Sequence, residues 1–214
     1  MFVVDNQRIC PRQTRKTVKK FRILPREAGI HSTQAWRQKP VNHTLFLLCI
    51  VLGGCVSIPD HIQAVTPFDI HRYLGRWYEI ARLDHSFERG LSRVTADYSL
   101  RDDGGVKVIN RGYSSDKKAW QEAEGKAYFV EGHDTGFLKV SFFGPFYGSY
   151  VIFDLDQQDY RYSLVAGPNR SYLWILSRSP VMEQGIKSQL IAKARAMGFA
   201  TDQLIFPEYP DGTD

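Results

Sequence analysis

The sequence has little cysteine and no long hydrophobic run, and each shortage excludes a class of protein. Only three cysteines occur in 214 residues, so a disulfide-dense secreted scaffold is excluded. The apolar stretch from Leu45 to Gly54 holds ten residues, whereas a membrane-spanning helix needs about 20. The stretch instead fits the apolar region of a signal peptide, which is about 7–15 residues long.

Patterns for catalysis, metal binding and cofactor binding are missing as well. The six histidines show no metal-ligand spacing, and neither a Gly-x-Ser-x-Gly motif nor a glycine-rich phosphate loop occurs. Asp84, His85 and Ser86 are contiguous, but neighbours on a strand point to opposite faces, which argues against a relay. We therefore predict no catalytic residues, no metal and no cofactor. An enzyme acting on lipid through His85 is the alternative.

Positive charge is concentrated at the start of the chain. The formal net charge is +5, but residues 1–44 alone carry +8, with ten Lys/Arg and two Asp/Glu. The remaining residues carry −3, with 18 Lys/Arg and 21 Asp/Glu. A basic chain suggests nucleic-acid binding only when the folded domain is basic, so nucleic-acid binding is not expected.

Leu52-Gly53-Gly54-Cys55 closes the apolar stretch and resembles the lipobox of bacterial lipoproteins. The resemblance implies cleavage before Cys55, a thioether-linked lipid on its sulfur and an acylated N-terminus. Two or more acyl chains anchor a protein stably, whereas one binds marginally. Val56 and Ser57, in place of an aspartate, favour the outer membrane by analogy, with the periplasmic face as the default. The alternative is a buried helix with an incidental cysteine.

This reading divides the chain into four parts. Residues 1–54 are a basic leader and signal peptide, 55–66 a lipidated tether, 67–207 the folded domain and 208–214 a tail. Residues 1–40 are either a long basic n-region or a mis-assigned start, with Val41 as the initiator. After cleavage only Cys55 remains, so no intramolecular disulfide forms. Roughly 160 residues suffice for one hydrophobic core.

The folded part reads as all-β followed by one helix. Short runs rich in Val, Ile, Tyr, Phe and Trp alternate with Gly, Asp, Asn and Pro clusters, a pattern typical of antiparallel strands joined by tight turns. We expect eight strands, near 76–83, 94–100, 106–113, 119–130, 137–143, 148–155, 160–166 and 172–178. Eight such strands predict a closed up-and-down barrel whose interior holds side chains or one small ligand.

Periodicity supports both parts of this reading. Val94, Ala96, Tyr98 and Leu100 alternate with polar residues, as in a half-buried strand. From Ile186 to Met197 apolar residues recur at helical spacing, and Gly198 is a suitable C-cap. We expect this helix to pack outside the barrel, with Leu204 to Phe206 returning as a short edge strand.

Two motifs resemble those of the lipocalin family. Gly75-Arg76-Trp77-Tyr78-Glu79 is similar to its Gly-x-Trp-Tyr signature, and Leu176-Ser177-Arg178 to its last motif. The resemblance implies structural roles for Gly75, Trp77, Tyr78 and Arg178, with the arginine packed over the tryptophan by a cation–π contact. The middle family motif is altered here to Phe153-Asp154-Leu155-Asp156. The resemblance covers about residues 67–207 and is strongest to bacterial outer-membrane and apolipoprotein-D-like lipocalins.

The resemblance implies a cup that binds a fatty acid, a lysophospholipid or a similar amphiphile. The candidate ligand-binding residues are Ala96, Tyr98, Val108, Tyr128, Val140, Phe142, Tyr147, Tyr150, Tyr162 and Trp174, with ordinary core packing as the alternative for each. One or two of four arginines could pair with an anionic headgroup, although a solvated surface is the simpler expectation for Arg82, Arg89, Arg93 and Arg111. Glu79 is expected to be buried beside a polar partner.

The dense aromatic segment from Phe143 to Gly148 supports a rival function. Its Gly144-Pro145 pair places it on a hairpin near an open end, where Phe and Tyr either admit an acyl chain or contact another chain. The alternative is therefore a structural or interaction protein of the envelope, with a filled barrel and a homodimer or partner patch.

Overall fold

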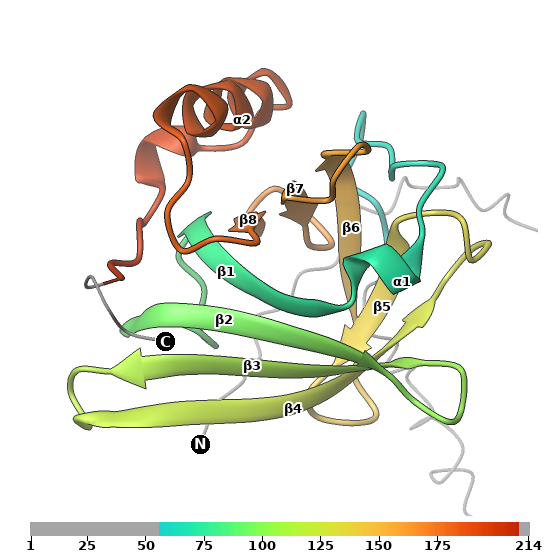
Figure 1. The fold of residues 1–214 in the computed structure, drawn as a ribbon, viewed down its shortest axis with the longest axis horizontal. Helices are drawn as coiled ribbons and strands as arrows, with labels where there is room; N and C mark the ends of the chain where they lie inside the picture. The colour runs from blue at the N-terminus through green and yellow to red at the C-terminus, as the bar shows by residue number, and fades with distance from the viewer. Residues whose placement is uncertain (1–55, 210–214) are drawn as a thin grey trace, which may run out of the picture. The chain divides into compact units, whose positions relative to one another are not determined.

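The computed structural model describes residues 56–209, and its strands pair in chain order into one closed antiparallel barrel (Figure 1). The predicted eight-stranded up-and-down barrel is confirmed. Its strands are β1 Gly75–Arg82, β2 Leu91–Leu100, β3 Val106–Ser114, β4 Ala119–Phe129, β5 Phe137–Ser141, β6 Gly148–Leu155, β7 Tyr162–Ala166 and β8 Leu173–Ser177.

Within the described residues, helical elements precede and follow the barrel strands. Helix α1, Ile70–Tyr73, precedes β1 and is capped by Asp69, whose carboxylate accepts from the His71 N–H at 2.9 Å. Helix α2, Gln184–Ala196, follows β8, and the 3₁₀ helix η2, Thr201–Gln203, comes after it. Within residues 56–209 no helix has both the length and the apolar character that crossing a membrane requires.

Where α2 covers the barrel, the wall carries apolar residues on its outer face as well as on its inner face. Ala81, Leu164 and Ile175 face outward and pack with Leu190 and Ala194 of α2, which lies outside the barrel in Figure 1. The C-cap follows the prediction, because Gly198 has φ +84°, a conformation that glycine adopts without strain. The expected edge strand at 204–206 is a single bridge between Ile205 and Arg82.

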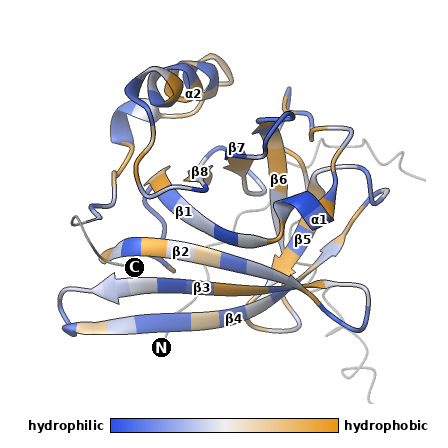
Figure 2. Ribbon diagram, viewed as in Figure 1, coloured by the Kyte–Doolittle hydropathy of each residue, from blue (hydrophilic) through white to orange (hydrophobic). Residues whose placement is uncertain are grey.

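Inward-facing residues form a second cluster inside the barrel. It contains Trp77, Tyr98, Val108, Ile152 and Val165 among others. Strands β2, β3 and β4 are covered on one face only, and Figure 2 shows hydrophobic and hydrophilic residues mixed along them. The period of two in their sequence therefore reflects an interior face and a solvent face.

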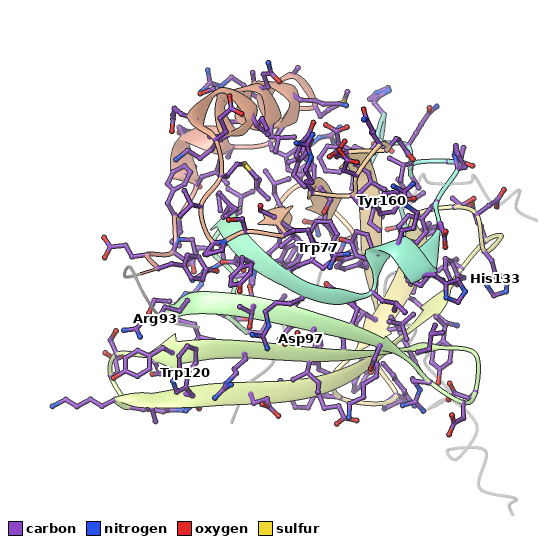
Figure 3. The ribbon with its side chains drawn as sticks, in the orientation of Figure 1. Trp77, Arg93, Asp97, Trp120, His133 and Tyr160 are labelled. Carbon is purple, nitrogen blue, oxygen red and sulfur yellow. The ribbon has the colours of Figure 1, made fainter. Side chains whose placement is uncertain are left out.

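The antiparallel order sorts the loops between two ends of the barrel. The closed end carries α1 and the turns at 101–105, 130–136 and 156–161. The opposite end, called the mouth here, carries the connections at 83–90, 115–118, 142–147 and 167–172. Figure 3 shows Trp120 and Arg93 toward the mouth and His133 toward the closed end.

Candidate functional site

The closed end is sealed by an aromatic and arginine stack. The rings of Tyr73 and Trp77 are stacked with centroids 4.5 Å apart, and Trp77 Nε1 donates to the Tyr73 carbonyl at 2.8 Å. The guanidinium carbon of Arg178 lies 4.1 Å from the Trp77 ring centroid. Arg178 also donates to the carbonyls of Arg72, Arg76 and Tyr160 at 2.8, 2.9 and 3.3 Å. This arrangement links α1, β1 and the end of β8, and so fixes the floor of the interior.

Above this floor, four hydroxyl groups form a chain within the interior cluster. The hydroxyl oxygens of Tyr98 and Tyr150 lie 2.8 Å apart, and those of Tyr150 and Tyr73 lie 2.9 Å apart. Tyr73 continues to Ser163 Oγ at 3.2 Å. Burial raises the pKa of Tyr73 to about 12 and those of Tyr98 and Tyr150 well above their usual value. These phenols therefore stay neutral and provide hydrogen-bonding capacity in an otherwise apolar lining.

A buried ionic cluster lies on the mouth side of the interior. Arg82 is 1% exposed, and its Nη1 donates to Glu79 Oε1. Its Nη2 donates to the carbonyls of Glu88 and Leu91 at 3.1 and 3.0 Å. Glu88 in turn accepts from Trp174 Nε1 at 3.1 Å, and His85 Nε2 lies 3.1 Å from the same carboxylate oxygen. The cluster ties the 83–90 connection to β1 and β8.

The pKa values of the two carboxyl groups in this cluster shift in opposite directions. Burial, and then the charge of Glu88, raises the pKa of Glu79 well above its ordinary value despite the neighbouring Arg82. Burial alone would raise the pKa of Glu88, but the imidazole of His85 and the Trp174 N–H outweigh it and lower that pKa to about 2. Glu79 therefore holds a proton more tightly than Glu88 does.

Aromatic rings surround the histidine of this cluster. His85 stacks on Phe87 with centroids 4.0 Å apart and packs against Trp174 at 5.0 Å. Tyr172 completes the group at 5.9 Å from His85. His85 Nδ1 is buried without a hydrogen-bond partner. This side of the mouth is therefore covered by a loop that is held both by rings and by charges.

The wall formed by β2, β3 and β4 carries small inward-facing residues. Ala96, Asn110 and Ala123 share one register line and face inward, and all three are partly exposed. Asn110 Oδ1 nevertheless lacks a partner. Across the mouth, Gly148 pairs with inward-facing Val140, and a Cβ built on it meets no atom within 4 Å. Small residues therefore leave room on the mouth side of the barrel.

Of the ten candidate ligand-binding residues, the structure places seven in the interior cluster: Ala96, Tyr98, Val108, Val140, Phe142, Tyr150 and Trp174. It places the other three outside. Tyr128 pairs with Lys139 on the outer face and donates to Asp103 at 2.9 Å, and Tyr147 lies beside Tyr128 and Lys139. Tyr162 packs with the cluster under α2. Strand alternation puts Tyr128 and Tyr162 on the side opposite to Ala127 and Ser163.

The four candidate arginines also differ in their position relative to the barrel wall. The expectation of a solvated surface is wrong for Arg82, because a β-bulge turns it into the barrel. Arg89 is exposed and pairs with Asp84 at 2.9 Å. Arg93 and Arg111 lie on the outer wall, each with its guanidinium near the Trp120 ring, at 5.9 and 4.9 Å from the centroid. Only Arg82 is therefore placed to act from within the interior.

Sequence reasoning missed the buried cluster as a unit. Glu79 was expected to be buried without a named partner, and its partners are Arg82 and the carboxyl of Glu88. The signal that the sequence offered was the expected burial of Glu79 on the first strand. Cys55 lies outside the described residues. Within 56–209 no group of three or more His, Cys, Asp or Glu residues is arranged to hold a metal ion.

One surface hollow lies apart from this site. It has a volume of about 430 Å³ and is lined at the closed end by Phe68, Arg72 and Tyr160 among others. Arg72 occupies part of it, since its guanidinium stacks on Tyr160 at 4.2 Å. None of the residues that line this hollow belongs to the buried ionic cluster, so we assign the candidate site to the interior.

Comparison with known proteins agrees with this geometry. The family model described as a lipocalin-like domain matches residues 68–209. An outer membrane lipoprotein Blc from Vibrio cholerae is 57% identical over 162 residues, which cover 76% of this chain and 95% of that protein. The Escherichia coli K12 protein of the same name is 54% identical over 161 residues, 75% of this chain and 90% of its own length. Rat apolipoprotein D is 34% identical, covering 61% of this chain and 69% of that protein.

Solved structures resemble the barrel at lower identity. Insecticyanin from the tobacco hornworm has a TM-score of 0.58 at 19% identity, covering 72% of this chain and 88% of its own. The cockroach allergen Per a 4 has a TM-score of 0.56, also at 19% identity, covering 72% and 95%. At this identity the likeness supports the fold alone.

Proposed function

The chain belongs to the lipocalin-like family, and from this premise we propose that it is a lipid-anchored envelope protein that binds a fatty acid or lysophospholipid in its barrel. Binding and release require no covalent chemistry. The observation that carries the proposal is an interior with two chemistries. Its walls are largely apolar and include small residues, and its mouth side holds a buried arginine and two carboxyl groups.

An amphiphile matches this division of the interior. An acyl chain would lie against Val108, Val140 and Phe142, while Arg82 on the mouth side offers a partner for a polar headgroup. Burying a 16-carbon tail gives a gross gain on the order of 10 kcal/mol at about 0.8 kcal/mol per CH₂. Association costs about 4–15 kcal/mol. The resulting net affinity is weak to moderate, which suits a protein that both holds a lipid and releases it.

Outer-membrane attachment through Cys55 is the second part of the proposal. The lipobox-like Leu52-Gly53-Gly54-Cys55 and the printed name of the relatives, outer membrane lipoprotein, support it. Expression of the full chain with radiolabelled palmitate should label the wild type and leave Cys55→Ala unlabelled and outside the membrane fraction. Palmitate incorporation into Cys55→Ala would contradict the assignment.

The ligand proposal is tested on residues 56–214, which contain the complete barrel and α2. Native mass spectrometry with added lysophosphatidylethanolamine or palmitate should show adducts of one ligand per chain. Ala96→Trp places a large ring in the interior and should abolish them. Thr95→Trp is the matched control, because Thr95 lies next to Ala96 but on the outer face. Absence of any adduct in the wild type would overturn the proposal.

The rival is an envelope interaction protein, and one observation favours it. Phe143 and Phe146 on the 142–147 hairpin are 44% and 49% exposed, a large apolar surface for a soluble loop. This function would be supported if the protein self-associates without bound amphiphile as its concentration increases. Changing both Phe143 and Phe146 to serine should then weaken the association.

A further inference from the structure

The first described residues hold the start of the mature chain at the mouth of the barrel. The Ser57 N–H donates to Ser149 Oγ at 2.7 Å, and Ser57 Oγ donates to the Pro168 carbonyl at 3.2 Å. Ser149 is the second residue of β6, which begins at the mouth, and Pro168 lies in the 167–172 turn of the same end. Val56 and Ile58 pack against the outer hydrophobic cluster. Residue 56 is therefore fixed beside the mouth.

This position leaves almost no tether between an anchor and the mouth. Cys55 is joined to Val56 by one peptide bond, and consecutive Cα atoms are about 3.8 Å apart. A lipid on Cys55 would therefore enter the bilayer within a few ångströms of the β6 end of the mouth. A long flexible linker would permit any orientation of the barrel, whereas this short one does not.

The mouth presents the residues that suit a lipid–water interface. Trp120 is the second residue of β4, close to the 115–118 hairpin, and is 44% exposed. Phe143 and Phe146 are exposed on the 142–147 hairpin of the same end. Figure 3 shows Arg93 beside Trp120 at this end. Aromatic rings and arginine together favour the interface, because the ring enters the headgroup region while the guanidinium binds phosphate.

The net charge of the loops also differs between the two ends of the barrel, and the mouth is the more positive end. The closed-end turns 101–105, 130–136 and 156–161 contain six acidic residues against two Lys/Arg. The mouth connections 83–90, 115–118, 142–147 and 167–172 contain four Lys/Arg against three acidic residues, of which Glu88 is buried. An anionic lipid surface therefore attracts the mouth and repels the closed end.

From these observations we propose that the mouth of the barrel rests on the bilayer that holds the anchor. Trp120, Phe143 and Phe146 then lie in the headgroup region, and an amphiphile passes between bilayer and interior without crossing bulk water. This inference rests on the proposed lipidation of Cys55 and on the proposed ligand class. It adds the orientation of the barrel and the route of the ligand.

Single added cysteines test the orientation, since the predicted mature chain contains only Cys55, which the lipid occupies. In the full lipidated chain, Phe146→Cys at the mouth and Leu100→Cys at the closed end replace side chains that are both 49% exposed. Phe143→Cys and Val130→Cys form a second pair. Each variant carries a fluorophore on the added cysteine and is reconstituted in vesicles of phosphatidylethanolamine and phosphatidylglycerol.

The expected result is opposite quenching at the two ends. Labels at 143 and 146 should be quenched by doxyl-labelled phospholipid and shielded from iodide, whereas labels at 100 and 130 should be quenched by iodide only. Equal quenching at both ends, or lipid quenching at the closed end, would overturn the proposal. The label at 146 could instead be shielded from iodide only at high protein density and without lipid quenching. That result would show a second copy of the chain on this surface and would also overturn the proposal.

The same preparations separate this inference from the proposed function. Intact mass reports the lipid on Cys55, and titration with lysophosphatidylethanolamine reports binding. If lipidation and binding are present but the quenching pattern is absent, only the orientation is wrong. If lipidation or binding is absent, the proposed function itself fails.

Discussion

Glu79 and Arg82 are three residues apart on β1, yet both side chains point into the barrel and form an ion pair. In a regular strand, residues three apart point to opposite faces. The register of β1 against β8 shifts between Glu79 and Ala81, so one extra residue reverses the alternation before Arg82. The bulge therefore places a guanidinium in an interior that the sequence pattern assigns to apolar residues.

Replacement of Arg82 should destabilise the domain strongly. Arg82→Ala removes the partner of Glu79 and leaves the carbonyls of Glu88 and Leu91 without their donor. Breaking a buried pair in this way costs about 3–5 kcal/mol, to be measured by urea denaturation. Arg89→Ala is the control, because its exposed pair with Asp84 is worth less than about 1 kcal/mol. Equal losses in the two variants would contradict the role given to the buried pair.

Glu79 and Glu88 should contribute to the free energy of unfolding with opposite dependences on pH. The pKa of Glu88 falls on folding from its ordinary value of 4.5 to about 2, so its stabilising contribution exists above 4.5 and is lost as pH falls toward 2. The pKa of Glu79 rises on folding, so its contribution is full below 4.5 and is lost as pH increases toward the raised pKa.

Glutamine variants separate these two contributions. Glu79→Gln cannot ionise, so it should remove the loss of unfolding free energy above pH 4.5 and leave the acid limb in place. Glu88→Gln should remove the acid limb and lower stability at pH 7. Denaturation at pH 3, 5, 7 and 9 measures both effects. Parallel pH profiles for the two variants would show that the glutamates do not titrate in opposite directions.

Much of the fold was predictable because it depends on local pattern. Strand alternation, turn residues and the helical period at 186–197 identified the eight strands and α2 to within a few residues. The stack of Arg178 on Trp77 followed from the resemblance of two short motifs, and the structure has it at 4.1 Å. Elements of this kind are specified by neighbours in sequence or by a family signature.

The placement of individual side chains was less predictable, since it depends on register and bulges. Tyr128 and Tyr162 were assigned to the ligand by their aromatic character, but each lies one residue away from an inward-facing position. For Arg82 a solvated surface was the simpler of two expectations, and a single register shift reverses its side of the wall. The buried ionic cluster of Glu79, Arg82 and Glu88 joins a strand to a loop. Periodicity along the sequence cannot predict such a contact.

The tyrosine hydroxyl chain should contribute to stability in proportion to the bonds that each hydroxyl makes. Tyr150→Phe removes the central hydroxyl and leaves Tyr73 and Tyr98 each without one buried partner. We expect a loss of about 1–3 kcal/mol, the usual cost of unsatisfied buried polar groups. Tyr128→Phe on the outer wall removes one exposed hydrogen bond to Asp103 and should change stability little. Similar stabilities for the two variants by thermal unfolding would show that the chain is not a buried network.

Filling the space beside Gly148 should block ligand binding without unfolding the barrel. A Cβ at this position faces inward and meets no atom within 4 Å, so Gly148→Leu places its side chain in open space on the mouth side. Affinity for lysophosphatidylethanolamine should therefore fall while the unfolding midpoint stays near that of the wild type. Gly125→Ala is the contrasting variant, because its Cβ would lie 2.8 Å from the Phe142 ring and 3.0 Å from the Ser141 carbonyl. That change should lower the unfolding midpoint, since the carbonyl belongs to the neighbouring strand and cannot move aside. Isothermal titration and thermal unfolding of both variants separate occupancy of the interior from damage to its wall, and unchanged affinity in Gly148→Leu would place the ligand elsewhere.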